Sequence, residues 1–464
     1  MRSSPRATWS SSGGLVLIVA LNWGAIAHAD SLQDNSQAAA LDAGAVATTP
    51  TVEVGAPASG PVPGETWSTV LKERLGIAAS LRAAFFSKDL SFTGETGFAI
   101  GSFWLTAKPE EVLGIRTFLD ARVQGQNLSR SSHLTWDVRE AYAETSLGDF
   151  DFKAGRQLTV WGRADKVNPT DVWSSRDYTF LAADDEDQLL GIAALQVAWN
   201  HWDHRLIVFW QPEWRPPVYP LGFLPPGIAV RNLNPTGQLA QIGMKLDHSG
   251  GRVDYAVSYA HLINKSPDLA LLSAGPAGID LGLQFNKIEV VGADAAIVLG
   301  DYGLRAEVAY TQTGNTSGSS ALEQDSTLFG VVGVDRTFEG IFNVNVQYLH
   351  RHMFNWRDAS QIADSTLRLG AVQEQLATNQ LARDMPGAST RLDFKAFNET
   401  LEVECAFVIW FTKADATLRP KVTYALTDHF KAVVGGQIYL GPTASFFGRF
   451  DSASAVLAEV RANF

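Results

Sequence analysis

The feature that most narrows the fold is an alternation of apolar and polar residues that recurs from Trp67 onward. In Tyr302–Thr313, for example, one face holds Leu304, Ala306, Val308 and Tyr310, and the other holds Arg305, Glu307, Ala309 and Thr311. Successive side chains of a β-strand point to opposite sides of the sheet, so each such segment predicts a strand with two unlike faces. A soluble β-sandwich alternates in the same way, and the connectors must therefore decide between the two architectures.

We count 18 alternating segments, most of about nine to fourteen residues. They are 75–87, 97–107, 112–124, 133–146, 150–160, 189–199, 204–211, 237–247, 251–263, 285–298, 303–313, 326–336, 340–350, 389–397, 399–411, 415–426, 430–440 and 455–464. Connectors after even-numbered segments have one to four residues, whereas most of those after odd-numbered segments are longer. Short turns on one side and long loops on the other are typical of an outer-membrane β-barrel. We therefore predict one transmembrane antiparallel barrel over 67–464 with about 18 strands, or 16 if some boundaries shift.

The N-terminus is typical of a secretory signal peptide over residues 1–29. Two arginines open it, an apolar stretch follows from Gly14 to Ala27, and Ala27-His28-Ala29 fits the small-x-small cleavage rule. The stretch is short for a permanent membrane anchor, which is the alternative. Residues 30–66 are rich in Ala, Thr, Pro, Gly and Ser, a composition that predicts a flexible periplasmic leader. Such a leader serves as a plain linker or as a docking arm for a periplasmic partner.

Composition excludes several other classes of protein. The 464 residues carry a formal charge of −12, so the basic excess that nucleic-acid binding needs is missing. A helical membrane protein would show several runs of about 20 apolar residues, and the only such run is N-terminal. The single cysteine, Cys405, excludes intramolecular disulfides and Cys-based zinc sites. In lipid every backbone N–H and C=O needs a partner, so a secreted chain without membrane helices can span only as a closed barrel.

The last segment gives an independent indication of the same membrane. It alternates to its end and closes on Phe464. A terminal aromatic after an alternating strand resembles the signal that the outer-membrane assembly machinery reads. We therefore expect that machinery, outer-membrane lipid and lipopolysaccharide as partners.

The predicted register also assigns the side chains that face the lumen, which in an 18-stranded barrel is too wide for side chains alone to fill. The pore-lining candidates are Arg116, Asp120, Arg122, Glu140, Lys153, Arg305, Glu307, Arg419, Lys421 and Lys431. The same face holds Glu144, Asp151, Lys245, Arg252, Asp254, Glu402 and Glu404. Any water-filled barrel needs polar inward residues for solvation and cross-strand pairing, which is the alternative to a role in solute binding. The mixed signs predict no strong ion selectivity, and Arg419, Lys421 and Lys431 form one local basic patch.

The connector 161–188 is the most unusual segment of the chain. Its density of charged and aromatic residues predicts a constriction loop folded into the pore through Arg–carboxylate pairs, or else a structured surface loop. The constriction candidates are Trp161, Arg163, Asp165, Asn168, Asp171, Arg176 and Asp177. The acidic residues Asp184, Asp185 and Asp187, with Glu186, could supply oxygen ligands to Ca²⁺. They lack the glycine and spacing of a calcium loop, which favours a solvated acidic segment and no metal or other cofactor.

Two further connectors are long enough to affect the mouth of a barrel. The proline-rich connector 212–236 should be stiff and could cap the mouth. The connector 351–388 has apolar residues at helical spacing between Leu367 and Met385, which predicts a short helix over or inside the lumen, or on the surface.

Two stretches of sequence resemble a group of Gram-negative outer-membrane barrels. They are Ala154-Gly155-Arg156-Gln157 with Trp161-Gly162 and Asn168-Pro169, and the closing strands from Leu418-Arg419-Pro420-Lys421 through Thr427-Asp428-His429 to Phe446-Phe447-Gly448. Both look like the DUF1302 family and, more distantly, the alginate-export porins. The resemblance implies an outer-membrane barrel, with 18 strands in the alginate exporters, and no substrate. The alginate exporters have a strongly Arg-rich lumen, and the mixed charges here depart from that pattern.

The leading function is a passive channel for diffusion or export of small polar or amphiphilic solutes. The alternative is a plugged outer-membrane accessory or binding protein that works with an inner-membrane exporter of hydrophobic molecules. An enzyme would need a Ser–His pair with an orienting group. His261, His350, His352 and His429 are available, but no serine lies at a telling spacing, so we expect no enzyme.

Overall fold

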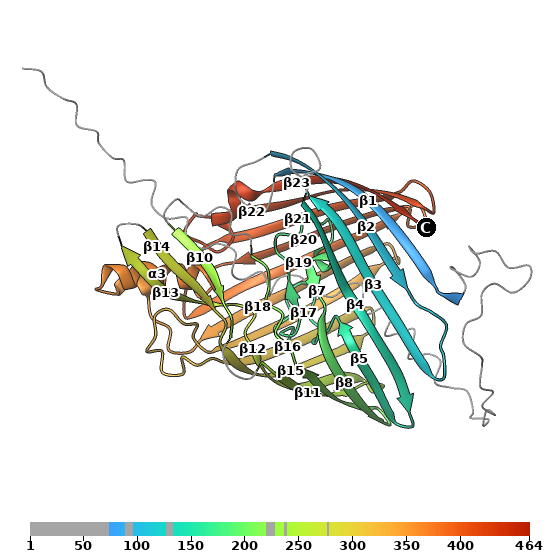
Figure 1. The fold of residues 1–464 in the computed structure, drawn as a ribbon, viewed down its shortest axis with the longest axis horizontal. Coiled ribbons are helices and arrows are strands. Elements are labelled where there is room, and N and C mark those ends of the chain that lie inside the picture. The colour runs from blue at the N-terminus through green and yellow to red at the C-terminus, as the bar shows by residue number, and fades with distance from the viewer. Residues whose placement is uncertain (1–73, 89–95, 127–132, 220–227, 236–238, 276–277) are drawn as a thin grey trace, which may run out of the picture.

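The alternating segments form one closed antiparallel sheet in the computed structural model (Figure 1). The structure describes residues 74–88, 96–126, 133–219, 228–235, 239–275 and 278–464. The expected signal peptide and the expected leader both lie outside these ranges.

Eighteen strands make up the barrel wall. They are β1 (Ile77–Lys88), β2 (Thr96–Ala107), β3 (Ile115–Gln126), β4 (His133–Leu147), β5 (Phe150–Gln157), β8 (Ile192–His201), β9 (His204–Gln211), β11 (Gln241–His248), β12 (Val253–Ile263), β15 (Lys287–Leu299), β16 (Tyr302–Gln312), β17 (Thr327–Phe338), β18 (Phe342–Met353), β19 (Asp384–Ala396), β20 (Leu401–Trp410), β21 (Asp415–Ala425), β22 (Phe430–Leu440) and β23 (Ala455–Asn463). Each strand pairs with the next in sequence, and β23 pairs with β1 to close the ring. The 18-stranded barrel is confirmed, and each predicted segment overlaps one strand of the wall.

The outer surface of the barrel is apolar. On β1, Leu81 and Phe85 point outward with exposed fractions of 52% and 53%, whereas the alternate residue Phe86 is buried. On β16 the exposed residues are Val308 and Tyr310, and their neighbour Glu307 is buried. The predicted division of each strand into two faces is therefore correct at these positions, and an exposed apolar band of this kind suits contact with lipid.

The two ends of the barrel differ as the connector lengths predicted. One end carries the short turns and the C-terminus, and the other carries the longer connectors with their own secondary structure (Figure 1). There, β10 (Ile228–Leu233), β14 (Gly278–Gln284) and β13 (Asp268–Gly275) form a small sheet in that order. The connector after β18 holds the short helix η3 (Ala359–Gln361) and the helix α3 (Ser365–Ala377).

Several boundaries differ from the prediction by three residues or more, including the starts of β3, β8 and β11. Helix α3 ends at Ala377, short of the predicted Met385, because Asp384 and Met385 already belong to β19. Strand β19 begins five residues before the predicted position 389, in a stretch where Pro386 and Gly387 hide the alternation. Strand β5 ends at Gln157 rather than at 160.

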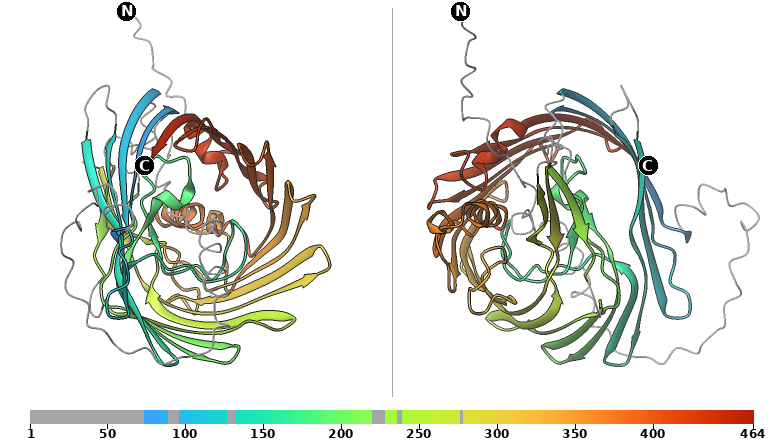
Figure 2. Two further views of the ribbon diagram at one scale, coloured as in Figure 1. Left: turned by 90° about the vertical axis from the view of Figure 1, so that its right-hand side faces the viewer. Right: turned by 60° about the vertical axis from the view of Figure 1, so that its left-hand side comes forward.

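Two connectors fold back against the inner wall of the barrel (Figure 2). The connector between β5 and β8, called here the inner loop (residues 158–191), contains β6 (Ser175–Arg176), η2 (Asp185–Gln188) and β7 (Leu189–Leu190). The connector between β22 and β23 contains η4 (Gly448–Ala453). Among the residues with a described structure, no helix combines the length and the apolar character needed to cross a membrane.

Apolar side chains from these connectors fill the long-connector half of the barrel interior. Val167 of the inner loop and Phe446 belong to one buried cluster with Trp410, which ends β20 on that side. Trp161 and Trp173 form another with Phe209, near the same end of β9.

Candidate functional site

A cavity lies inside the barrel, between the inner loop and the short turns. Its volume is about 730 Å³, and its lining runs from Gly340 and Glu399 at the short turns to residues 181–188 of the inner loop. The wall strands that contribute are mainly β16–β23. Charged lining residues of both signs are Lys166, Arg305, Arg391, Lys395, Arg419, Lys421, Lys431 and Arg461, with Asp165, Asp184, Asp185, Glu186, Asp187, Asp335, Asp393, Glu399, Glu402 and Glu404.

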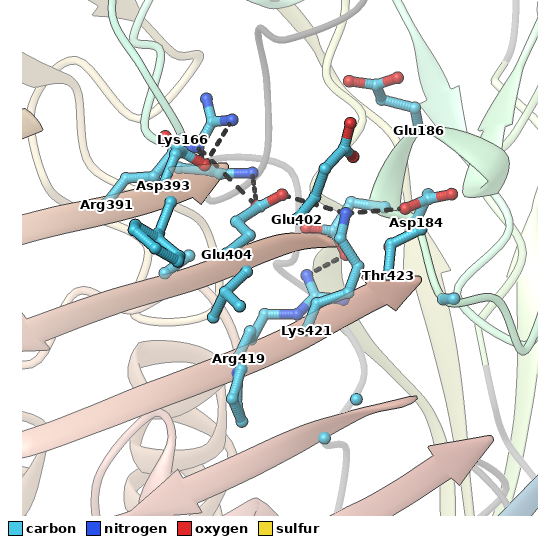
Figure 3. A pocket seen from close by; sticks show the side chains of 18 of the residues that line it. Lys166, Asp184, Glu186, Arg391, Asp393, Glu402, Glu404, Arg419, Lys421 and Thr423 are labelled. Carbon is cyan, nitrogen blue, oxygen red and sulfur yellow. Dashed lines mark hydrogen bonds and ion pairs between the residues drawn. The ribbon is translucent and has the colours of Figure 1, made fainter. Parts of the chain in front are cut away.

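The centre of this cavity wall is an ion-pair network around Glu404 on β20 (Figure 3). Its carboxylate oxygens lie 2.9 Å from Lys166 Nζ, 3.0 Å from Lys421 Nζ and 3.8 Å from Arg391 Nε. Burial alone would lower the pKa of Lys166, but the Glu404 carboxylate raises it above its usual range. The lysine of the inner loop is therefore held charged against the wall.

The acidic segment of the inner loop meets a second group of wall cations. Asp184 lies 2.9 Å from Lys421 Nζ and 2.8 Å from Arg461 Nη2, and Asp185 contacts Arg419. Burial alone would raise the pKa of Asp184, but Lys421 and Arg461 hold it well below its ordinary value. The segment is therefore anionic where it crosses to β21 and β23.

The other side of the acidic segment is held by arginines from the first strands. Arg82 Nη1 donates to Asp187 at 2.7 Å, and Arg122 donates to the Asp187 carbonyl oxygen. Arg139 donates to the Glu186 carbonyl oxygen at 2.8 Å. All three guanidinium groups lie within 5.3 Å of the centre of the Trp104 ring, a geometry in which cation–π attraction adds to the ion pairs.

The first part of the inner loop is tied to the opposite wall. Arg163 lies 2.5 Å from both Asp247 and Asp294, on β11 and β15. Glu307 of β16 accepts hydrogen bonds from the N–H groups of Arg163, Ala164 and Thr170 at 2.7 to 3.0 Å. Gly162 is required at its position, because it has φ of +97° and an added Cβ would approach Glu307 Oε2 within 2.6 Å.

The predicted constriction residues do not converge on one opening. Trp161 packs on Trp173, and Asn168 donates to the Trp161 carbonyl oxygen at 2.7 Å. Asp165 lies 3.7 Å from Arg391 at the cavity, and burial raises its pKa to about 6. The Asp171 N–H donates to the Asn168 carbonyl oxygen, Arg176 donates to the Asp185 carbonyl oxygen, and Asp177 accepts from Thr179. Their role in a constriction stays a prediction.

The predicted pore-lining residues divide into those that line the cavity and those that contact other parts of the barrel. Arg305, Arg419, Lys421 and Lys431 line the cavity. Arg116 instead pairs with Glu144, Asp120 with Arg139, Lys153 lies over the Tyr142 ring, and Glu140 accepts from the Leu158 N–H. Arg122 and Glu307 hold the inner loop, as described above.

The calcium hypothesis for the acidic run finds no support in this geometry. Asp184, Asp185 and Asp187 each contact separate cations instead of turning toward one point. Within the described part of the chain no three histidine, cysteine or carboxylate residues are placed to hold a metal ion. The alternative of a solvated acidic segment does not describe the geometry either, because wall cations contact Asp184, Asp185 and Asp187.

Sequence reasoning missed four arginines of this site: Arg82, Arg139, Arg391 and Arg461. Strict alternation marks Arg82, Arg391 and Arg461 as inward residues, so that signal was available. Arg139 lacks such a signal, because the pairing of β3 with β4 shifts between Asp120 and Ala121. A β-bulge places two successive residues on one face, and here Arg139 and Glu140 both point inward.

Comparisons with known proteins show the fold alone. No protein-family model matches the chain, and no curated protein matches it in sequence. Solved structures that share the fold include OccAB3 of Acinetobacter baumannii, with 10% identity, TM-score 0.51, and coverage of 84% of this chain and 98% of that one. OccK1 (OpdK) of Pseudomonas aeruginosa has 9% identity, TM-score 0.50 and coverage of 84% and 98%. Another structure of OpdK, described as an outer membrane protein, has 10% identity, TM-score 0.49 and the same coverage. The resemblance to DUF1302 and the alginate-export porins finds no support here beyond the barrel itself.

Proposed function

We propose that the chain is an outer-membrane channel through which small polar or amphiphilic solutes diffuse without chemical conversion. The observation that carries the proposal is the charged cavity of about 730 Å³ inside a closed barrel. Sites for small molecules typically have volumes of about 300–1,000 Å³, so the cavity has room for one such solute. Its polar lining suits a hydrated solute better than a purely apolar one.

The outer surface supports the placement in a membrane. A closed ring of paired strands satisfies its backbone N–H and C=O groups internally, which is the condition for spanning lipid. The apolar band on its outer surface then faces the lipid tails. The shared fold with OpdK, a protein described as an outer membrane protein, supports the outer membrane in particular. The cavity would then open to the periplasm, because short turns face that side in such barrels.

A specific observation also favours the second candidate, a plugged barrel that works with an inner-membrane exporter. The apolar clusters around Trp410 and around Trp161 occupy the long-connector half of the interior. If these packed connectors close the lumen, solute passage through the channel requires the inner loop to move. In the plugged reading, the loop stays in place and a partner acts from the short-turn side.

Single-channel recording in a planar bilayer under a salt gradient separates these two readings. We expect stable conductance steps with a small reversal potential, because the cavity lining carries both signs of charge. The control for folding is the faster migration of unheated barrel on a denaturing gel. A correctly folded barrel without any conductance would overturn the channel and favour the plugged protein.

A further inference from the structure

The geometry points to a built-in competitor: we propose that Asp184–Asp187 occupies a binding site for small multivalent anions on the barrel wall and competes with such anions for it. This inference rests on the proposed channel function and names a class of solute that the wall of the channel binds. The wall site consists of six cations, which are Arg82, Arg122, Arg139, Arg419, Lys421 and Arg461.

Cations of the barrel wall contact the acidic segment from both sides. Lys421, Arg461 and Arg419 reach it from β21 and β23. Arg82, Arg122 and Arg139 reach it from β1, β3 and β4. These strands are neighbours across the closure of the barrel, so the six cations form one patch in space although they span 380 positions from Arg82 to Arg461.

The cations of this wall site outnumber the wall carboxylates that contact them. Within 4.0 Å of these cations the wall supplies four carboxylates, from Asp120, Asp137, Glu404 and Glu459. Six cations against four acids leave the wall positive. In the part of the chain that is described, the only carboxylate partners of Arg82 and Arg419 are Asp187 and Asp185 of the loop. If the loop left, these two guanidinium groups would lose the carboxylates that contact them.

The acidic segment is compact, and part of the wall site is open to the cavity. The carboxylates of the segment are presented on one tight turn, closed by the hydrogen bond from the Asp187 N–H to the Asp184 carbonyl oxygen at 3.2 Å. A compact molecule with two or three anionic groups can reproduce that arrangement. Arg419, Lys421 and Arg461 line the cavity together with the loop itself, so an anion that enters from the short turns reaches them directly.

The test is the full-length triple variant Asp184→Asn, Asp185→Asn and Asp187→Asn, recorded in planar bilayers beside the wild type. Losing the competing charge should raise conductance, shift the reversal potential toward anions, and let citrate block the current at a concentration at least about tenfold lower. The matched control neutralises three acids in the short turns, Asp149→Asn, Asp301→Asn and Asp428→Asn. It changes net charge equally and should leave all three readouts near the wild-type values.

A second measurement needs no variant. Citrate, but not chloride at equal ionic strength, should speed trypsin cleavage after Lys166 or Arg176 in the folded wild-type barrel, because it displaces the inner loop. Accelerated cleavage in a barrel that never conducts would retain the anion site and overturn the channel. The proposed competition would be wrong if the barrel conducts but citrate does not speed cleavage and blocks the triple variant at the same concentration as the wild type. If the triple variant does not fold, the cleavage assay alone decides.

Discussion

Glu307 is the single wall residue on which the first part of the inner loop depends most. Its exposed fraction is 3%, and its carboxylate accepts hydrogen bonds from three backbone N–H groups and from Thr170 Oγ1, the latter at 2.9 Å. A buried N–H without an acceptor costs about 1–3 kcal/mol, more than a hydrogen bond contributes on average. The carboxylate thus acts as a template that fixes the backbone of the loop.

Glu307→Ala should therefore destabilise the folded barrel by at least about 2 kcal/mol, since the N–H groups of Arg163 and Ala164 lose their acceptor at once, while the Thr170 N–H keeps Asn168 Oδ1. Glu307→Gln keeps one acceptor oxygen and should lose less than half as much. The measurement is the free energy of unfolding in urea, with trypsin cleavage at Arg163 as a local readout. Equal stability of the alanine variant and the wild type would show that the loop does not depend on this residue.

The inward position of Glu307 could be predicted from alternation, but its partners could not. Alternation is a local property, because the side-chain period of a strand is two. The partners Arg163 and Thr170 lie 144 and 137 positions away, and only the closure of the barrel brings them close. The same holds for Arg163, whose partners lie on β11 and β15.

At the scale of elements, the helix α3 is docked on the small outer sheet by acidic residues. Glu374 accepts a hydrogen bond from the Leu269 N–H of β13 at 2.9 Å, and both Glu374 and the adjoining Asp268 are buried. Burial raises the pKa of Asp268 to about 6, although Gln324 and Asn286 donate to it. Burial and the neighbouring Asp268 raise the pKa of Glu374 well above its usual range.

This docking should weaken as pH rises. The packed state binds the Asp268 proton more tightly than the open state, so its stabilisation is complete below the ordinary value of 3.8 and is lost as pH rises through about 6. Between about pH 5 and pH 7, hydrogen-exchange protection of the α3 amides should fall by at least about tenfold after correction for intrinsic rates, because the raised pKa of Glu374 acts in the same direction. Asp268→Asn should reduce that step, and Asp268→Asn combined with Glu374→Gln should abolish it. Asp280→Asn, on β14 of the same sheet, should retain it, and a pH-independent wild type would contradict the assignment.

The elements themselves were predictable wherever alternation is uninterrupted. All 18 wall strands follow from the pattern, because each must present an apolar face to one side and a polar face to the other. The prediction failed at the start of β19, where Pro386 lies within the strand and resembles loop chemistry. It also missed that Phe446 and Phe450 fold inward, since a loop sequence does not tell which side of the wall it covers.

At the scale of the whole molecule, the barrel depends on one seam between its first and last strands. Residues from Ser80 to Phe86 pair with residues from Leu457 to Asn463, and Phe464 exchanges backbone hydrogen bonds with Ala79 at 2.8 and 3.1 Å. This pairing joins positions almost 400 residues apart, so it carries the largest loop-closure cost of any strand pair. The seam also holds Arg82 and Arg461, so its closure assembles both sides of the cation patch.

Val460→Pro tests whether this seam is what closes the barrel. Val460 pairs with Ala83 of β1 on one side and with Ala432 of β22 on the other, so its N–H serves one of the two ladders. Proline removes that donor from a strand paired on both sides, a position that proline essentially never occupies, whereas Val460→Ala keeps the donor and trims only an outward side chain. We expect the proline variant to lose the fast-migrating unheated band on a denaturing gel and the alanine variant to keep it. A proline variant that still migrates as a folded barrel would mean that the ring closes without this rung, and that the cation patch can assemble before the seam is complete.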